Sequence, residues 1–352
     1  MFDRIDYSIT MSHRIEIVVP SGLEALARAE AQRIAGLRLD PPTASGVIQA
    51  TMRGSLPALF DLRCATSVFV VRTFAIPRPR ALLGDEHLRA VLAMITMVQR
   101  LHPAGTFQTL FLSAAGADSS VLQRFKHTLS ERLGLAVGAE DGDLLLRLRP
   151  SVRSGWDLLV RLTPRPLATR PWRVCNREGA LNGPVAHAMA LLSRPHPTDR
   201  VLNIGCGSGT LLIERLLIGP AVQALGCDTD PAALACAYRN VAAAGLGRNV
   251  LLYDWDAQAL PLPTASMDVI LADLPFGHLV GSHTTNLSLY PALLREAARV
   301  TRASGRAVLI SHEVRLMERT LAELPVWHCE QQLRVDLGGL YPRIFVLRRR
   351  DD

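Results

Sequence analysis

The sequence predicts an α/β protein: a C-terminal doubly wound domain with a mostly parallel sheet, preceded by two smaller α+β modules. Between residues 200 and 311, short apolar runs alternate with helical patterns, which is typical of parallel strands joined by crossover helices. Proline-rich stretches at residues 77–80 and 163–166 interrupt the pattern and indicate linkers. A chain of 352 residues is also long enough for two or three domains.

Residues 1–76 are expected to form a small ferredoxin-like module. Leu23, Leu26 and Ile34 share one face at helical spacing and predict a helix between two strands. The expected order is strand 14–19, helix 22–35, strand 46–52, helix 56–64 and strand 67–76. This βαβαβ order fits a ferredoxin-like fold.

Residues 77–165 are expected to form a second module, followed by a linker at residues 166–178. Ser119 or Ser120 suits the N-cap of a helix, because a serine hydroxyl accepts a hydrogen bond from the first free backbone amides. The expected elements are helix 85–100, strand 107–113, helix 119–133, and strands 144–148 and 156–162.

Residues 179–352 are expected to form the doubly wound domain. Pro231 suits the first turn of a helix, because its missing amide is not needed there. The expected elements are strand 200–204, helix 209–217, strand 222–227, helix 231–243, strands 250–253 and 269–272, helix 287–302, strand 307–311 and a closing hairpin of 330–336 with 344–349. Ligands of such sheets bind at the carboxyl ends of the strands.

The excess positive charge lies on the N-terminal side. The net charge is +7; residues 1–199 hold 24 Lys and Arg against 17 Asp and Glu, whereas residues 200–352 hold 15 of each. Between residues 147 and 173 a single acid, Asp157, accompanies Arg147, Arg149, Arg153, Arg161, Arg165, Arg170 and Arg173. Such a stretch suits contact with nucleic-acid phosphates, and a solvated arginine-rich surface explains it equally well.

The cysteines are expected to be reduced core thiols, because this long chain contains no CxxC pair that would indicate a disulfide or zinc framework. They are Cys64, Cys175, Cys206, Cys227, Cys236 and Cys329. No apolar run approaches the roughly 18–20 residues of a membrane span, and the N-terminus lacks the apolar stretch of a signal peptide. The sequence therefore predicts a cytoplasmic protein with no membrane partner and no bound metal.

A glycine-rich turn follows the strand expected at residues 200–204. It reads Asn203-Ile204-Gly205-Cys206-Gly207-Ser208-Gly209-Thr210. Glycines let the chain turn sharply and approach a ligand closely. NAD-binding folds also have such a turn, but this one is not GxGxxG, and the chain has no GK[ST] motif of an NTP-binding loop.

Acidic residues follow the next two expected strands. Asp228 and Asp230 end the first, where a carboxylate can accept hydrogen bonds from both ribose hydroxyls. Asp254 and Asp256 end the second of these strands, where an acid can accept a hydrogen bond from an adenine amine. A glycine loop, an acid and an acid, in that order, suit S-adenosylmethionine. The alternative is that these acids are helix caps or surface residues.

The tetrapeptide Asp273-Leu274-Pro275-Phe276 follows a further buried strand. A base amine is a poor nucleophile, because its lone pair is delocalised into the ring. The Asp273 carboxylate and the Leu274 carbonyl could each accept a hydrogen bond from one N–H of the amine. Holding both N–H groups in this way localises the lone pair on the nitrogen. Pro275 would fix the backbone, and Phe276 would stack on the base. The alternative is an ordinary strand-ending turn with a capped Asp and a core Phe.

These motifs resemble the THUMP-domain RNA methyltransferases that make N2-methylguanosine, and most of all the members that act on guanosine 6 of the tRNA acceptor stem. Residues 19–26 are similar to the family's opening, and residues 54–63 resemble the end of its N-terminal domain. Residues 166–173 resemble the family's junction ahead of the catalytic domain, and residues 179–182 resemble an element that lies beside the cofactor. Residues 205–210, together with Glu214, resemble the family's cofactor loop. The similarity covers nearly the whole chain.

The resemblance implies a class I Rossmann-like methyltransferase domain at residues 179–352 and a THUMP RNA-binding domain at residues 77–165. It also implies S-adenosylmethionine as cofactor. The expected cofactor-binding residues are Asn182, Asn203, Gly205, Gly207, Ser208, Gly209, Thr210, Asp228, Asp230 and Asp256. The chain departs from the family at Asn203-Ile204, where Asp-Pro is usual, and DLPF stands where NPPY or DPPY is frequent.

We therefore expect a monomeric RNA methyltransferase that acts on tRNA, with the need for a small activating subunit left open. Alternative substrates are guanosine 10 of tRNA, ribosomal RNA, a DNA adenine or a glutamine amide; the basic N-terminal half argues against the last two. An alternative of a different class is a catalytically silent RNA-binding scaffold. The intact Asp273-Leu274-Pro275-Phe276 argues against it.

Overall fold

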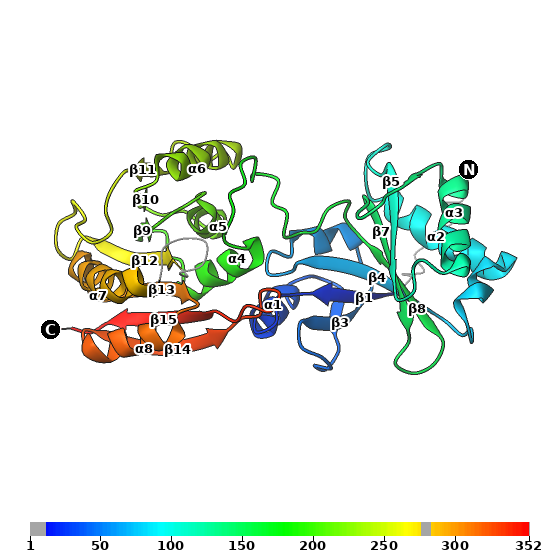
Figure 1. The fold of residues 1–352 in the computed structure, drawn as a ribbon, viewed down its shortest axis with the longest axis horizontal. Helices are drawn as coiled ribbons and strands as arrows, with labels where there is room; N and C mark the ends of the chain where they lie inside the picture. Colours follow the sequence, from blue (N-terminus) through cyan, green and yellow to red (C-terminus); the bar gives the residue numbers. More distant parts are fainter. Residues whose placement is uncertain (1–11, 276–282, 352) are drawn as a thin grey trace, which may run out of the picture. The chain divides into compact units, whose positions relative to one another are not determined.

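The computed structural model describes residues 12–275 and 283–351. The chain divides into two compact units. Unit one comprises the residues up to Val19 together with Ala27–Leu167, and unit two comprises Pro20–Leu26 together with the residues from Ala168 onward. Each unit is built on its own β-sheet (Figure 1). Within the described ranges, no helix has the length and apolar character needed to cross a membrane.

Unit one contains an eight-stranded sheet with the strand order β2-β3-β1-β4-β8-β7-β5-β6. Its strands are β1 (His13–Val18), β2 (Leu37–Leu39), β3 (Val47–Met52), β4 (Ser67–Phe74), β5 (Thr109–Ala114), β6 (Ala136–Val137), β7 (Leu144–Pro150) and β8 (Trp156–Arg161). The helices between residues 12 and 167 are α1 (Glu24–Ala31), η1 (Leu56–Asp61), η2 (Pro79–Leu83), α2 (Asp85–Gln99) and α3 (Ser120–Leu133).

Two features of unit one differ from the sequence expectation. The α-helix expected at residues 56–64 is the short 3-10 helix η1, with Pro57 in its first turn. Strand β4 pairs antiparallel with β8, so a single sheet runs across the boundary predicted between residues 76 and 77. The two modules predicted on either side of that boundary therefore share one sheet.

The arginine stretch of residues 147–173 does not form one free stripe. The buried Arg161 donates hydrogen bonds to the carbonyls of Thr163, Gly142 and Pro164, so it braces the end of β8. Arg149 pairs with the buried carboxylate of Glu16. Arg153 and Arg165 are exposed, so the stretch combines structural arginines with solvated ones.

Unit two contains a seven-stranded sheet with the order β11-β10-β9-β12-β13-β15-β14. Its strands are β9 (Arg200–Ile204), β10 (Gln223–Cys227), β11 (Leu251–Tyr253), β12 (Met267–Asp273), β13 (Thr301–Ser311), β14 (Trp327–Arg334) and β15 (Arg343–Arg349). Its helices are α4 (Gly183–Leu192), α5 (Thr210–Ile218), α6 (Pro231–Ala243), α7 (His283–Val300) and α8 (Val314–Glu323). The predicted closing hairpin is confirmed as the antiparallel pair β14–β15.

Alternate residues of the central strands of unit two enter two separate cores. Along β12, Val269 and Leu271 pack with helices α4, α5 and α6, whereas Ile270 and Ala272 pack with α7 and α8. Strands buried on both faces read as continuous apolar runs, which explains why residues 267–272 are recognisable in the sequence. Figure 1 shows these helices on the two faces of the sheet.

Candidate active site

The site lies where the order of the parallel strands reverses. The chain runs from β9 outward to β10 and β11, then returns to place β12 on the other side of β9. Strands β9 and β12 are parallel neighbours, with Ile204 opposite Ala272. The glycine turn after β9 and Asp273 at the end of β12 are thereby brought together at the carboxyl edge of the sheet, where ligands of such folds bind.

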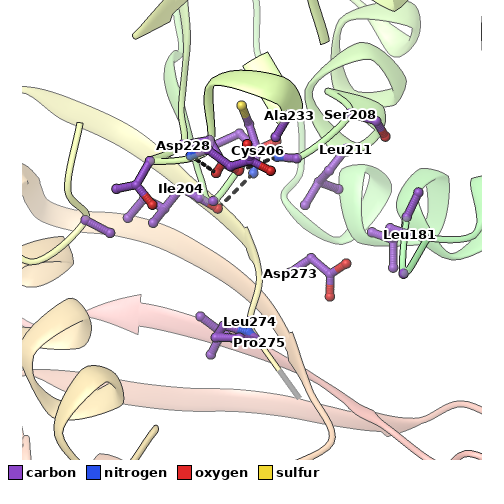
Figure 2. Close-up of a pocket in the computed structure, with 18 of the residues that line it drawn as sticks. Leu181, Ile204, Cys206, Ser208, Leu211, Asp228, Ala233, Asp273, Leu274 and Pro275 are labelled. Atoms are coloured by element: carbon purple, nitrogen blue, oxygen red, sulfur yellow. Dashed lines mark hydrogen bonds between the residues drawn. The ribbon is translucent and has the colours of Figure 1, made fainter. Parts of the chain in front are cut away.

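A cavity of about 450 Å³ occupies this edge, a size within the range of small-molecule and cofactor sites. Figure 2 shows the glycine loop above it and the Asp273 carboxyl projecting from the end of β12. Of the residues predicted for the site, those that line the cavity are Asn203, Gly205, Gly207, Ser208, Thr210, Asp228, Asp230, Asp256, Asp273, Leu274 and Pro275. Phe276 lies outside the described residues.

Positive backbone angles explain the glycines of the turn. Gly205 and Gly207 have φ values of 56° and 53°, a conformation that disfavours other residues. A Cβ added at either would meet no heavy atom within 4 Å, so the space beside them is the cavity. Gly209 differs: it precedes α5 at φ 79°, and a Cβ there would stand 3.4 Å from Ala237 on α6. That distance is an ordinary contact, so the positive φ rather than crowding favours glycine at this position.

Asp228 braces the glycine turn. Its Oδ2 accepts a hydrogen bond from the Gly207 amide at 2.8 Å, and its Oδ1 accepts one from the Asp230 amide at 3.0 Å. A carboxylate offers about four acceptor positions, so both oxygens keep capacity for a ligand's hydroxyl groups. Asp228 therefore combines a structural role with a place in the cavity wall.

Asp230 acts as a helix cap, which was the alternative considered for it. Its Oδ1 accepts from the Ala232 amide at 2.8 Å in the first turn of α6, and its carboxylate pairs with Arg177. The pKa of Asp230 is lowered, mainly by the hydrogen bond from Ala232 and in part by Arg177. Arg177 already pairs with the Asp230 carboxylate, whereas the hydrogen bonds described for Asp228 come from backbone amides, so Asp228 is the better candidate for binding a ribose.

Asp256, after strand β11, has an aromatic neighbour that the sequence did not indicate as a site residue. Asp256 lines the cavity beside Trp255, and its Oδ1 accepts from the Gln258 amide at 2.9 Å. The Trp255 ring stacks on Tyr253, with ring centroids 4.1 Å apart and planes 5° from parallel. The stack fixes one aromatic wall of the cavity next to Asp256.

Asn203 lines the cavity and has an enclosed side-chain oxygen that is unpaired within the described part of the chain. Its Nδ2 donates to the Leu271 carbonyl at 3.1 Å, which joins β9 to β12. Its enclosed Oδ1 has no hydrogen-bond partner among the described residues. A buried acceptor without a donor is unfavourable, so a ligand carrying an N–H group would be stabilised there.

The other predicted polar residues have mainly structural surroundings. The hydroxyls of Ser208 and Thr210 lie 3.0 Å apart, and Thr210 also accepts from Arg173 at 2.8 Å. Asn182 stands at the N-terminus of α4 rather than in the cavity wall. Its neighbour Leu181 lines the cavity instead.

Asp273 has the most perturbed carboxyl group of the site. Although the residue is partly exposed, its Oδ1 is enclosed and lacks a partner among the described residues. Burial raises the pKa of Asp273 to about 7, because a carboxylate in apolar surroundings is poorly solvated. Strongly shifted groups in a cavity are candidates for function.

Residues 170–181, most of which the sequence analysis assigned to a linker at 166–178, belong to unit two and contact its helices α5 and α6. The buried Arg170 donates to Glu214 of α5 at 2.8 Å, and His187 of α4 contacts the same carboxylate at 3.0 Å. Arg173 donates to the Leu181 carbonyl at 2.7 Å. These contacts hold residues 177–181 as one wall of the cavity.

A disulfide bond corrects the prediction that all cysteines are reduced. Cys175 is bonded to Cys236 of α6, with Cα atoms 5.4 Å apart. Asn240 strengthens the same contact: its Oδ1 accepts from the Cys175 amide, and its Nδ2 donates to the carbonyls of Cys175 and Ser208. The residues are 61 positions apart in sequence and share no motif, so no sequence signal paired them.

The remaining cysteines, Cys64, Cys206, Cys227 and Cys329, are not disulfide-bonded. Cys206 lies inside the glycine turn, and its burial raises the pKa of its thiol well above the ordinary value. A thiol that resists ionisation is a poor nucleophile. Cys206 is therefore a packing residue, as the sequence indicated.

Solved structures share this architecture. TrmN from Thermus thermophilus matches with a TM-score of 0.74 and 24% identity over 96% of this chain and 99% of that one. SMU.472, a putative methyltransferase complexed with SAH, matches with a TM-score of 0.69 and 15% identity over 97% of this chain. The fold is thus that of a Rossmann-like methyltransferase preceded by a further α/β unit.

Residues 170–343 match the RMKL-like methyltransferase domain. The match lies within unit two, which is therefore similar to that methyltransferase domain.

Curated relatives carry guanine-N2 methyltransferase names. The tRNA (guanine(6)-N(2))-methyltransferase THUMP3 of Mus musculus is 33% identical over 182 residues, which is 48% of this chain and 36% of the relative. The tRNA (guanine(6)-N2)-methyltransferase of Thermus thermophilus is 33% identical over 206 residues, 58% of this chain and 60% of the relative. The U6 snRNA (guanine-N(2))-methyltransferase THUMPD2 of Bos taurus is 35% identical over 150 residues, covering 28% of its length. The matches thus span between about a quarter and three fifths of these relatives.

We predict that the Cys175–Cys236 bond stabilises unit two. In denaturant without reductant, alkylation followed by mass spectrometry should modify four thiols, because denaturant exposes the buried ones. Cys236→Ser should lower the free energy of unfolding by about 2–4 kcal/mol, as expected for a cross-link that limits the unfolded chain. Cys329→Ser, at a free and partly exposed cysteine, is the control and should change stability little. Six modified thiols without reductant would contradict the bond.

We predict that Asp228→Asn weakens binding of S-adenosylmethionine by about 1.5–3 kcal/mol, or about 10- to 150-fold, because it removes acceptors for charged-group hydrogen bonds. Asp230→Asn is the matched control: it alters the cap of α6 and should have the smaller effect. Isothermal titration calorimetry measures both. A larger loss in Asp230→Asn would assign the ribose contact to Asp230 and reject Asp228.

Proposed function

We propose that the protein is an S-adenosylmethionine-dependent RNA methyltransferase that forms N2-methylguanosine in tRNA, at position 6 of the acceptor stem. One observation carries the proposal: Asp273, with an enclosed and unpaired oxygen, shares a cavity with the glycine turn and the strand-end acids. The names of the guanine-N2 methyltransferase relatives support the choice of guanosine and of tRNA.

The cavity fits S-adenosylmethionine. The turn at Gly205 and Gly207 leaves room for close approach of a ligand, Asp228 suits the ribose hydroxyls, and Asp256 with the Trp255 ring suits the adenine. The unpaired Oδ1 of Asn203 suits an ammonium donor. When bound, this cofactor supplies a methyl group on a positively charged sulfur.

The chain's own residues prepare the nucleophile. The Asp273 carboxylate accepts one proton of the guanine amine and the Leu274 carbonyl accepts the other, which keeps the nitrogen lone pair out of the ring and available for transfer. The amine proton becomes acidic as the nitrogen gains positive charge, so no strong base is needed. A carboxylate with a pKa of about 7 suffices to receive it.

The positive charge of residues 1–199 supports RNA as the substrate. Phosphate contacts dominate the binding of structured RNA and are made mostly by arginine and lysine. We assign this role to the predicted ferredoxin-like and THUMP modules at residues 1–76 and 77–165, with a monomer in the cytoplasm as the acting form.

The test is mass spectrometry of nucleosides from bulk tRNA incubated with the protein and labelled S-adenosylmethionine. We expect label in N2-methylguanosine, and nuclease fragments should place it in the acceptor stem. Label at guanosine 10 or in ribosomal RNA would show that the substrate differs from the proposed one, while the reaction would remain guanine-N2 methylation. Cofactor binding without transfer to any RNA would point to a missing activating subunit, and absence of cofactor binding would overturn the proposal in favour of an RNA-binding scaffold.

Methyl transfer should depend on pH through Asp273. The carboxyl accepts the amine proton only when ionised, so the rate at subsaturating RNA should rise with pH through an apparent pKa near 7. Asp273→Asn should lower the single-turnover rate by roughly 100-fold and abolish the rise, while cofactor affinity stays near that of the unmodified protein. Asp254→Asn, an acid outside the cavity wall, is the control. A rate independent of pH between 5.5 and 8.5 would exclude this role.

A further inference from the structure

The carbonyl of Pro275 is held by two side chains of α7. Asn286 Nδ2 donates to it at 3.0 Å, and the Tyr290 hydroxyl lies 2.9 Å away. Both residues are fully buried. Two buried donors on one carbonyl of a strand-ending turn are more than that turn needs, since a single partner satisfies a buried carbonyl.

The hydroxyl of Tyr290 has a second partner that sets the direction of its proton. Ser311, at the end of β13, lies with its Oγ 2.8 Å from the Tyr290 oxygen. A carbonyl can only accept, so Tyr290 donates its single proton to Pro275 and accepts from Ser311. The Ser311 oxygen also accepts a hydrogen bond from the Glu313 amide at 2.9 Å. That bond uses a lone pair of the oxygen, so the hydroxyl proton of Ser311 remains available for donation to Tyr290. Burial raises the pKa of Tyr290, which keeps the hydroxyl protonated as a donor.

This arrangement completes the restraint of the backbone beside Asp273. The proline ring fixes φ at position 275, and the same ring confines Leu274 to extended conformations. The Leu274 amide donates to the Ile310 carbonyl at 3.0 Å, which anchors the other side of the turn to β13. Asn286 and Tyr290 anchor the Pro275 carbonyl to α7, so the residue that follows Leu274 is held in place from the side opposite β13.

We propose that Tyr290, supported by Ser311 and assisted by Asn286, is a positioning residue that holds Asp273 and Leu274 in the geometry for accepting the target amine. The inference rests on the proposed function for the nature of the amine. Tyr290 does not touch the substrate; it acts through the Pro275 carbonyl. The acceptor pair requires such support because misplacement of a reacting group by about 1 Å costs about 100-fold in rate.

The test compares Tyr290→Phe with Tyr238→Phe. Tyr238 also donates its hydroxyl to a backbone carbonyl, that of Leu252 at 3.0 Å, but it lies on α6 outside the cavity wall. Tyr290→Phe should lower the single-turnover rate of methyl transfer to tRNA by about 10-fold or more, as expected for a displaced acceptor, and should leave the affinity for S-adenosylmethionine within about twofold. Tyr238→Phe should change neither.

Two further measurements separate positioning from a general loss of structure. Ser311→Ala should slow the transfer as well, and the double variant should be no slower than Tyr290→Phe, because both act on one carbonyl. Hydrogen exchange of peptides spanning β12 should become faster at Leu274 in Tyr290→Phe and stay unchanged at Ile270–Ala272. This readout needs no RNA.

The outcomes distinguish the inference from the proposed function. Unchanged exchange at Leu274, or a normal transfer rate in Tyr290→Phe, would overturn the positioning role. Faster exchange at Leu274 in a protein that binds no S-adenosylmethionine would overturn the proposed function and leave Tyr290 as the residue that fixes this turn. Additive effects of Tyr290→Phe and Ser311→Ala would show that they act independently and would also reject the chain of donors.

Discussion

The parallel pairing of β9 with β12 is the constraint on which the site depends. Neither the glycine turn nor the Asp273-Leu274-Pro275 segment is a site by itself, and they are more than 60 positions apart in sequence. The pairing of Ile204 with Ala272 puts the two strand ends side by side. Asn203 reinforces it by donating across to the Leu271 carbonyl, so the same residue joins the strands and lines the cavity.

The second requirement is that the cavity be enclosed on the side away from the sheet. Residues 177–181 provide that wall, although they belong to no helix or strand. Their order comes from contacts of the residues that precede them: Arg170 with Glu214, and Cys175 with Cys236 and Asn240. Burying the Arg170 and Glu214 charges is costly unless they remain paired, so a displaced segment would leave charges without partners. The cost of exposing unpaired charges therefore stabilises this wall in addition to the contacts themselves.

The sequence predicted the doubly wound sheet and the residues at its strand ends because both follow from local pattern. Apolar runs mark β9 and β12, and the glycines and acids stand directly after them. It did not predict the disulfide, the buried role of Arg161 or the packing of residues 170–178, because these depend on partners distant in sequence. Helix α4 was also missed: it is buried nearly all round, so it lacks the one-sided periodicity that marks a surface helix. Asp230 lines the cavity, as predicted for a ligand residue, and also caps α6, since both roles use a carboxylate at the same place.

Burial at Asp273 sets two demands against each other. Enclosure removes water from around the carboxyl and strengthens any hydrogen bond that it makes to an amine, but it also raises the pKa to about 7 and disfavours the ionised form that accepts. Enclosure and ionisation therefore oppose one another at this one side chain: the same burial that strengthens its hydrogen bonds reduces the fraction of carboxylate that can accept one at neutral pH.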